Sequence, residues 1–448
     1  MNTFRIRDII ILGFMNFALF VGAGNIIFPP FIGLQAGTSV WTAAAGFLLT
    51  GVGLPVITAI VMAKAGGALS AVTRPAGRAL SAVTRPAGRV CGLLLAVICY
   101  LCIGPFFATP RTATVSYELA VQPFTGSERW LPVWSAVYFG IVILVSLYPG
   151  RLLDTVGRFL SPVKILALIV LAVAALAYPA GQPRAPEGVY ATAAFSQGLT
   201  SGYLTMDTMA SLAFGLVIVN AIRSRGVTSG RLITRYAVCS GLIAGAGLAL
   251  VYLSLFRLGT GSMGLTVSAT NGAQVLSAYV HHVFGAGGDV FLGALITLAC
   301  LVTAIGLTCA CAAWFSSVTR ISYRAYAWFF AAFSMLVSNM GLTQLIAFSV
   351  PALTAVYPVF IVLVLTYFIR ARFYSHTRVI APAALVSFVF GIADALSSAG
   401  ISVWPFRLVQ YLPLHNQGLA WLLPSLAVML AAAVADRWRS PPSLTEEG

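Results

Sequence analysis

Twelve runs of apolar residues divide this chain, and most of them are long enough for a helix to cross a bilayer, which takes about 20 residues. Of the 448 residues, 59% are hydrophobic and only 8% are charged. A soluble domain carries about 25% charged residues. The pattern therefore predicts an all-α polytopic membrane protein with twelve transmembrane helices, near residues 9–36, 40–63, 90–120, 132–149, 160–178, 194–222, 234–257, 287–318, 325–338, 345–369, 379–398 and 418–436.

The basic residues indicate the orientation of these spans. If the N-terminus is cytoplasmic and the spans alternate, 21 of the 26 Lys and Arg residues fall in cytoplasmic segments and only four in outside loops. Cytoplasmic loops of membrane proteins carry such an excess of positive charge. We therefore expect both termini in the cytoplasm. Topology also explains the net charge of +15, so no nucleic-acid partner is expected.

One cytoplasmic loop contains an identical tandem repeat. The stretch ALSAVTRPAGR at 68–78 occurs again, without a change, at 79–89. Structural repeats usually diverge in sequence, whereas these copies are identical at all positions, so we interpret the second as a recent duplication. Loops tolerate insertions at a small cost in entropy, and no function is expected of the second copy.

The first apolar run contains the stretch FVGAGNIIFPP, which is unsuited to an uninterrupted helix. An interior Gly costs about 1 kcal/mol and an interior Pro about 3 kcal/mol of helix stability. Gly22 and Gly24 allow the backbone to leave the helix, and Asn25 offers an amide oxygen. Pro29 and Pro30 are expected at the start of the next helical piece. Such a break would offer a half-helix N-terminus to a carboxylate and free carbonyl groups to Na⁺; close helix packing is the alternative.

The sixth run contains a second irregular stretch, FSQGLTSGYLTMDTMASLAFG, which predicts a break near residues 198–207. Asp207 lies near the midpoint of this run. A charged Asp at the centre of a bilayer costs roughly 2.5–3.5 kcal/mol. Asp207 is therefore either a ligand for substrate or cation or a structural hydrogen-bond anchor.

The third run contains GPFFATPR and, further on, Glu118. Phe106 and Phe107 are candidates for the wall of an apolar pocket. Arg111 and Glu118 are seven residues apart and share a helix face, so they are expected to form a pair or part of an outer gate.

Five stretches together resemble the bacterial branched-chain amino acid carrier family: GAGNIIFPPFIGLQAG, IGPFFATPRTA, GYLTMDTMASLAFGLVIVNAI, LVTAIGLTCACA and SNMGLTQLIAFSVPALTAVYP. They occur in order over nearly the whole chain. The doubled loop departs from the family pattern but touches no candidate site. The resemblance implies the leucine-transporter fold, which has two inverted five-helix repeats and two further helices. It places a first repeat at 1–178, a periplasmic linker at 179–193, the second repeat at 194–370, and the two extra helices with the tail at 371–448.

On this reading the substrate carboxylate meets the first break, its ammonium group meets the second break, and its branched side chain packs on apolar residues. The expected substrate-binding set is Gly22, Ala23, Gly24, Asn25, Phe106, Phe107, Tyr203, Thr205, Asp207 and Phe214. The resemblance further implies sodium ligands at Ala18, Val21, Thr303 and Thr308. Val302 lacks a hydroxyl, which leaves the number of sodium ligands open.

The expected function is import of leucine, isoleucine and valine across the bacterial inner membrane, coupled to Na⁺ and working by alternating access. No organic cofactor is expected, and the partners are the substrate and the lipid bilayer. Proton coupling is the nearest alternative. A channel would need a continuous polar pore, whereas polar residues cluster at two breaks. An enzyme is not expected, since the sequence has neither an HExxH zinc motif nor a Walker A segment.

Overall fold

The computed structural model describes residues 4–67, 89–148, 163, 165–265, 269–369, 372–400, 409 and 411–439. The duplicated stretch 68–88 lies outside the described residues. Within them every regular element is a helix. The chain forms two compact units, one of residues 1–77 with 98–349 and one of residues 78–97 with 350–448. The inverted repeats inferred from the sequence are a different division and stay a prediction.

The first half of the chain contributes nine α-helices to the described part, together with short 3₁₀ and π turns. The α-helices are α1 Ile6–Phe20, α2 Ala23–Ala36, α3 Val40–Leu48, α4 Leu54–Gly67, α6 Arg89–Leu101, α7 Ala108–Ala120, α8 Gln122–Thr125, α9 Leu131–Ser146 and a short apolar helix at Ile165–Ala177. The turns are η1 Gly37–Ser39, η2 Leu49–Gly53, η4 Cys102–Phe106 and η5 Glu128–Trp130.

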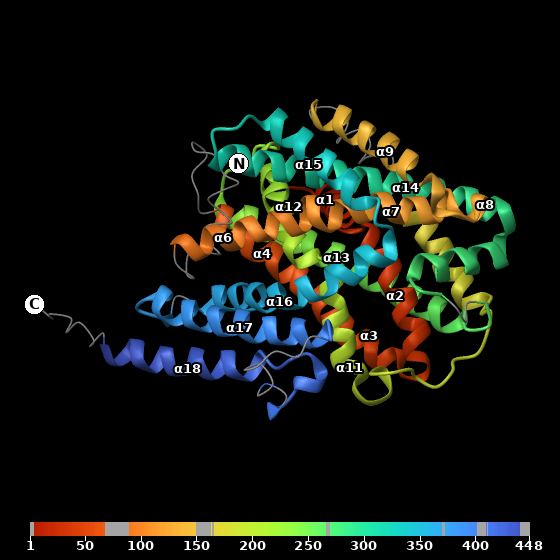
Figure 1. Ribbon diagram of the computed structural model, residues 1–448. Coiled ribbons are helices and arrows are strands. Elements are labelled where there is room, and N and C mark those ends of the chain that lie inside the picture. Colours follow the sequence, from red (N-terminus) through yellow and green to blue (C-terminus); the bar gives the residue numbers. More distant parts are fainter. Residues whose placement is uncertain are drawn as a thin grey trace, which may run out of the picture. The chain divides into compact units, whose positions relative to one another are not determined.

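The second half contains longer helices. They are α11 Tyr190–Ser201, α12 Asp207–Arg223, α13 Gly230–Gly261, α14 Gly272–Val318, α15 Tyr323–Ser338, α16 Leu342–Ile369, α17 His376–Ser398 and α18 Leu422–Arg439, with the 3₁₀ turns η6 Gly202–Thr205 and η9 His415–Gln417 (Figure 1). α14 joins two helices at Gly285, whose φ is +62°.

Seven helical stretches of the described chain are long and apolar enough to cross a membrane: Ala23–Ala65, Val90–Ala120, Glu128–Ser146, Gly230–Gly261, Gly272–Val318, Leu342–Ile369 and His376–Ser398. The bent pair Tyr190–Thr205 and Asp207–Arg223 would make an eighth. A multi-pass helical membrane protein is therefore confirmed. The count of twelve spans and the cytoplasmic termini stay predictions.

Glycines bring the helices of the first unit unusually close together. A Cβ atom on Gly33 of α2 would lie 2.3 Å from the carbonyl oxygen of Phe256, and one on Gly259 of α13 would lie 1.9 Å from that of Pro30. α3 and α11 meet in the same way through Gly46 and Gly198. Small residues let membrane helices bring their backbones together. These contacts hold α2, after the first break, against the long helix α13, and α11, before the second break, against the short helix α3.

In the second unit, α17 and α18 lie side by side (Figure 1). The buried carboxylate of Asp436 in α18 accepts the backbone N–H groups of Tyr374 (2.8 Å) and Ser375 (3.1 Å), just before α17 begins. These N–H groups have no partner inside the helix that follows. Asp436 therefore both satisfies them and attaches α18 to the start of α17.

Candidate functional site

The first break in the helices lies at Val21 and Gly22. α1 ends at Phe20, Val21 is extended (φ −66°, ψ 92°), and α2 begins at Ala23. The expectation for Pro29 and Pro30 was wrong, because both lie inside α2 and not at its start. A proline inside a helix removes the hydrogen bond to the carbonyl four residues earlier. The carbonyl groups of Asn25 and Ile26 are thereby released from helical bonding close to the break.

The second break lies between η6 and α12, and Met206 forms it. This residue is buried and has a φ of +60°, one of two positive φ values at non-glycine residues in the described chain. Side chains avoid this backbone region at a cost of about 1–3 kcal/mol, and such strained residues cluster at functional sites. The two pieces of the span meet at an angle of 42°. Asp207 is consequently the first residue of α12 and not the middle of a continuous helix.

A buried hydrogen-bonded cluster joins the two breaks to α13. Nδ2 of Asn25 donates to Oδ2 of Asp207 (2.6 Å) and is 2.5 Å from the hydroxyl of Tyr252. The Tyr252 hydroxyl also donates to Oδ2 of Asp207 (2.9 Å). Asp207 is only 3% exposed, so these donors replace the water that its charge would otherwise need. Its place at a helix N-terminus adds a favourable dipole interaction.

Asn25 uses both ends of its amide group. While its nitrogen faces Asp207, its Oδ1 accepts the backbone N–H of Gly22 (3.1 Å). The side chain therefore closes its own break and connects it to the second break, 182 residues further along the chain. This dual role requires an amide, since a carboxylate could not donate to Asp207 and an apolar residue could do neither.

Arg111, from α7, is buried beside this cluster. Its Nη1 donates to the carbonyl oxygen of Leu204 in η6 (2.6 Å), and its Nη2 donates to Oγ of Ser349 in α16 (2.9 Å). Its Cζ lies 5.0 Å from the centre of the Phe28 ring, within the range of a cation–π contact. It thus holds the last turn before the second break against α2 and α16.

The expected pair of Arg111 and Glu118 is not formed. Glu118 instead accepts a hydrogen bond from Nδ2 of Asn271 (3.1 Å), the residue that caps the N-terminus of α14. The spacing of seven residues put both side chains on one helix face, but each turns toward a different neighbouring helix. A gate role for either residue stays a prediction.

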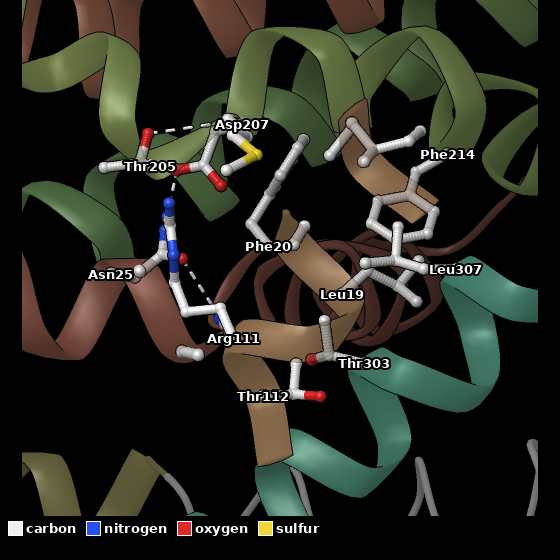
Figure 2. A pocket seen from close by; sticks show the side chains of 17 residues that line it. Leu19, Phe20, Asn25, Arg111, Thr112, Thr205, Asp207, Phe214, Thr303 and Leu307 are labelled. Carbon is white, nitrogen blue, oxygen red and sulfur yellow. Dashed lines mark hydrogen bonds between the residues drawn. The ribbon is translucent and has the colours of Figure 1, made fainter. Parts of the chain in front are cut away.

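A pocket lies where the two breaks, α7 and α14 meet, and all of its lining belongs to the first unit. The space left between its side chains is about 30 Å³, room for about two water molecules, so a ligand as large as an amino acid would need these side chains to move apart. Figure 2 shows that polar and apolar side chains line different sides of it. The polar side consists of Asn25, Arg111, Thr205 and Asp207; the apolar side consists of Leu19, Phe214 and Leu307, with Phe20 between them.

The structure brings most of the sequence-derived site residues together at this pocket. Those that line it are Gly22, Ala23, Gly24, Asn25, Arg111, Thr205, Asp207, Phe214 and Thr303. The residues that do not line it are Ala18, Val21, Phe106, Phe107, Glu118, Tyr203 and Thr308. Tyr203 and Thr308 are buried elsewhere in the first unit.

Phe106 and Phe107 do not form the apolar wall expected of them. Phe106 is 39% exposed and its ring contacts Phe333 of α15. The reason is the π turn η4, in which Gly104 has a non-helical backbone (φ −93°, ψ −118°). This turn changes the helical register, so that Ile103 and Ala108 face the pocket in place of the two phenylalanines.

Other lining residues were not anticipated. They are Leu19, Phe20, Ile103, Ala108, Thr112, Met206, Ala210 and Leu307. Helical spacing offered a signal for two of them, since Leu307 is four residues after Thr303 and Ala210 is four residues before Phe214, and residues four apart share a helix face. Of the others, Leu19, Phe20 and Met206 lie at the breaks, and Ile103, Ala108 and Thr112 lie in or after the π turn η4, whose geometry helical spacing does not predict.

Thr303 lies against the first break. A Cβ atom on Gly22 would be 3.3 Å from its Cγ2 and 3.6 Å from its Oγ1. The hydroxyl donates to the carbonyl oxygen of Ala299 (3.2 Å), which leaves its lone pairs available. Within the described residues no group of three His, Cys, Asp or Glu side chains could hold a metal ion, so any cation at this pocket would be held by hydroxyl, amide and carbonyl oxygens and by Asp207.

The chain is similar to known proteins over nearly its full length. A family model described as "Branched-chain amino acid transport protein" matches residues 5–439. The branched-chain amino acid transport system 3 carrier protein of Pseudomonas aeruginosa is 56% identical over 444 residues, 99% of each chain. The branched-chain amino acid permease BrnQ of Escherichia coli K12 is 55% identical over 97% of this chain and 96% of its own. The Bacillus subtilis branched-chain amino acid permease BraB is 39% identical over 100% of this chain and 99% of its own.

Solved structures of similar fold are also transporters. Mhp1, a nucleobase-cation-symport-1 family transporter, superimposes with a TM-score of 0.61 at 15% identity, covering 96% of this chain and 94% of its own. A Na⁺-coupled sialic acid symporter superimposes with a TM-score of 0.59 at 13% identity, covering 97% of this chain and 90% of its own. At these identities the likeness concerns the fold, which is that of leucine-transporter-like proteins.

Proposed function

This chain belongs to the branched-chain amino acid transport protein family, and from this premise we propose that it is a secondary symporter that imports leucine, isoleucine and valine together with Na⁺. Its relatives are permeases and carriers, so it is a transporter and not an enzyme. The bacterial inner membrane is its proposed location.

The observation that carries this proposal is the division of the pocket at the two breaks. A branched-chain amino acid has two charges at one end and an apolar side chain at the other. The pocket matches this with Asn25, Arg111 and Asp207 on one side and Leu19, Phe214 and Leu307 on another. A continuous polar pore would be lined differently, so this arrangement favours a carrier over a channel.

The proposed mechanism is alternating access in an assembly of twelve spans with both termini in the cytoplasm. The chain would consist of two inverted repeats with bounds at 1–178 and 194–370, joined by 179–193, and two extra helices in 371–448. Broken helices at the same place in two repeats are typical of transporters, in which one part rocks against the other around the site. The cluster of Asn25, Asp207 and Tyr252 would keep the two breaks in register during this movement.

Na⁺ is proposed as the coupling ion, held near the first break. The carbonyl groups of Ala18 and Val21 and the hydroxyl of Thr303, with Thr308 further along α14, are the proposed ligands. One positive charge that moves down about 100 mV releases roughly 2.3 kcal/mol. Since 1.36 kcal/mol corresponds to a factor of ten, this supports accumulation of about 50-fold.

The test is uptake of labelled leucine by the purified protein in proteoliposomes. An inward Na⁺ gradient should drive accumulation above equilibrium, and a sodium ionophore should abolish it. Accumulation with a proton gradient alone would replace Na⁺ by H⁺ in the proposal. Uptake that only equilibrates, with no dependence on either gradient and no saturation, would indicate a channel and overturn the symport.

A further inference from the structure

Arg111 is a buried cation that no carboxylate of the described chain contacts directly. The residue is 2% exposed. Among the described residues no carboxylate forms an ion pair with it, and both of its acceptors, the Leu204 carbonyl and the Ser349 hydroxyl, are neutral. Removing a guanidinium from water without an opposite charge is costly. An anion in direct contact with the guanidinium would therefore stabilise it.

The guanidinium also has donors to spare. It carries five N–H groups, and the two hydrogen bonds to Leu204 and Ser349 use only two of them. Its Nε is fully buried and has no acceptor in the described chain. Arginine binds carboxylates through two parallel N–H groups, and enough donors remain for that geometry without breaking either existing bond.

The guanidinium also lies directly beside a second positive feature, the N-terminus of α2. A Cβ atom on Gly24 would lie 3.4 Å from Nη1 of Arg111. Gly24 is in the first turn of α2, where backbone N–H groups lack helical partners and the helix dipole is positive. Because glycine has no side chain, the guanidinium approaches the N-terminus of α2 closely, and both favour an anion at the edge of the pocket that they line.

Asp207 supplies the opposite sign in the same pocket. The hydrogen bonds that Asn25 and Tyr252 donate to its carboxylate go to Oδ2, and Asp207 lines the pocket together with Arg111. We propose that Arg111 binds the α-carboxylate of the substrate, opposite an ammonium group at Asp207. This rests on the proposed function, in that the substrate is an amino acid, and it makes Arg111 a substrate-binding residue rather than an outer gate.

Competition between two ligands that differ only at the carboxylate tests the proposal. Leucinamide keeps the ammonium group and the side chain of leucine but replaces the carboxylate by a neutral amide. Each would compete with labelled leucine for the purified protein in detergent, so that no transport is needed. Leucine should bind the unchanged protein at least about 30-fold more tightly than leucinamide, the effect of losing one partner of a buried charge pair.

Variants of Arg111 then test whether this side chain causes the preference for leucine over leucinamide. In Arg111→Gln the preference for leucine should fall by at least roughly tenfold, and Arg111→Lys should keep an intermediate preference because it retains the charge without the two parallel donors. Arg320→Gln removes an exposed arginine and is the matched control. A purely structural role would weaken both ligands equally and leave their ratio unchanged, which would overturn the proposal.

Binding of the two ligands to the unchanged protein distinguishes a failure of the proposed role of Arg111 from a failure of the proposed function. If it binds leucine and leucinamide equally, the carboxylate is not recognised and the role of Arg111 is wrong, while transport of branched-chain amino acids stands. If it binds neither ligand, the proposed function fails as well. Should Arg111→Gln not fold, the Lys variant still decides, because an unaltered ratio in it would contradict the proposal.

Discussion

At the scale of single residues, the contact between Asn25 and Asp207 explains how a carboxylate is kept inside an apolar protein. The insertion cost of a charged residue singles out Asp207 in the sequence, but it does not reveal what stabilises it. Its two side-chain donors come from α2 and α13. A partner far away in the sequence becomes visible only when the helices are assembled.

The first prediction concerns Asp207→Asn. The amide keeps the shape and can still accept from Tyr252, but it has no charge for a substrate ammonium group or a cation. Leucine counterflow and net uptake should both fall by at least about tenfold, in line with the loss of a buried charged partner. Counterflow and net uptake are to be measured at two pH values. Loss of net uptake with intact counterflow would indicate that Asp207 carries a proton. Near-normal counterflow and net uptake would remove Asp207 from the site.

Some pocket residues could be predicted from the sequence and others could not. Glycines with Asn and Pro in an apolar run point to a break, and Gly22, Gly24 and Asn25 do lie at one. Phe106 was assigned on the assumption of a regular helix, and the π turn at Gly104 moved it out of the pocket. A change of register within a helix has no signal in composition or periodicity.

At the scale of elements, each broken segment is held by close backbone contact with a neighbouring helix. Gly259 of α13 and Gly33 of α2 leave no room for a Cβ atom between the two helices, which fixes the position of α2 after the first break. The apolar runs predicted that such helices exist, because their length and periodic composition are local properties. The ends of the helices were harder to predict from the sequence. α14 begins at Gly272, before the apolar run, because Gly285 allows a kink between two helices.

The second prediction compares two substitutions on α13. In Gly259→Ala the new methyl would lie 1.9 Å from the carbonyl oxygen of Pro30, so α2 must move. In Gly241→Ala the nearest atom would be 3.7 Å away, in Val56, which is ordinary contact. Gly259→Ala should lower the apparent melting temperature clearly and reduce leucine uptake, since overpacking costs about 1–3 kcal/mol. Gly241→Ala should change neither, and equal stability of the two would refute this view of the packing.

At the scale of the whole molecule, composition and charge were enough to predict a multi-pass helical membrane protein. The fold and the family then follow from long stretches shared with known carriers. The placement of the two breaks against each other could not be predicted in this way, because it depends on packing over distances of nearly 200 residues, such as that between Asn25 and Asp207.

The third prediction concerns the duplicated segment. Deletion of 79–89 leaves the identical first copy in place before α6, on the proposed cytoplasmic side, and removes no residue of the pocket. Leucine uptake at equal expression should therefore change by less than about twofold, since loops tolerate changes of length at little cost. A loss greater than about tenfold would show that the second copy has a role in transport.

The most direct test of the central claim, that the pocket at the two breaks binds the substrate, is leucine affinity in two glycine variants. Gly24→Leu fills the space between the first break, Thr205 and Arg111, whereas a Cβ atom on Gly140 of α9 would meet nothing within 4 Å. Both variants add the same side chain to a helix. We predict that purified Gly24→Leu loses measurable leucine binding while Gly140→Leu binds as the unchanged protein does. Normal affinity in a folded Gly24→Leu protein would place the substrate elsewhere and contradict the account.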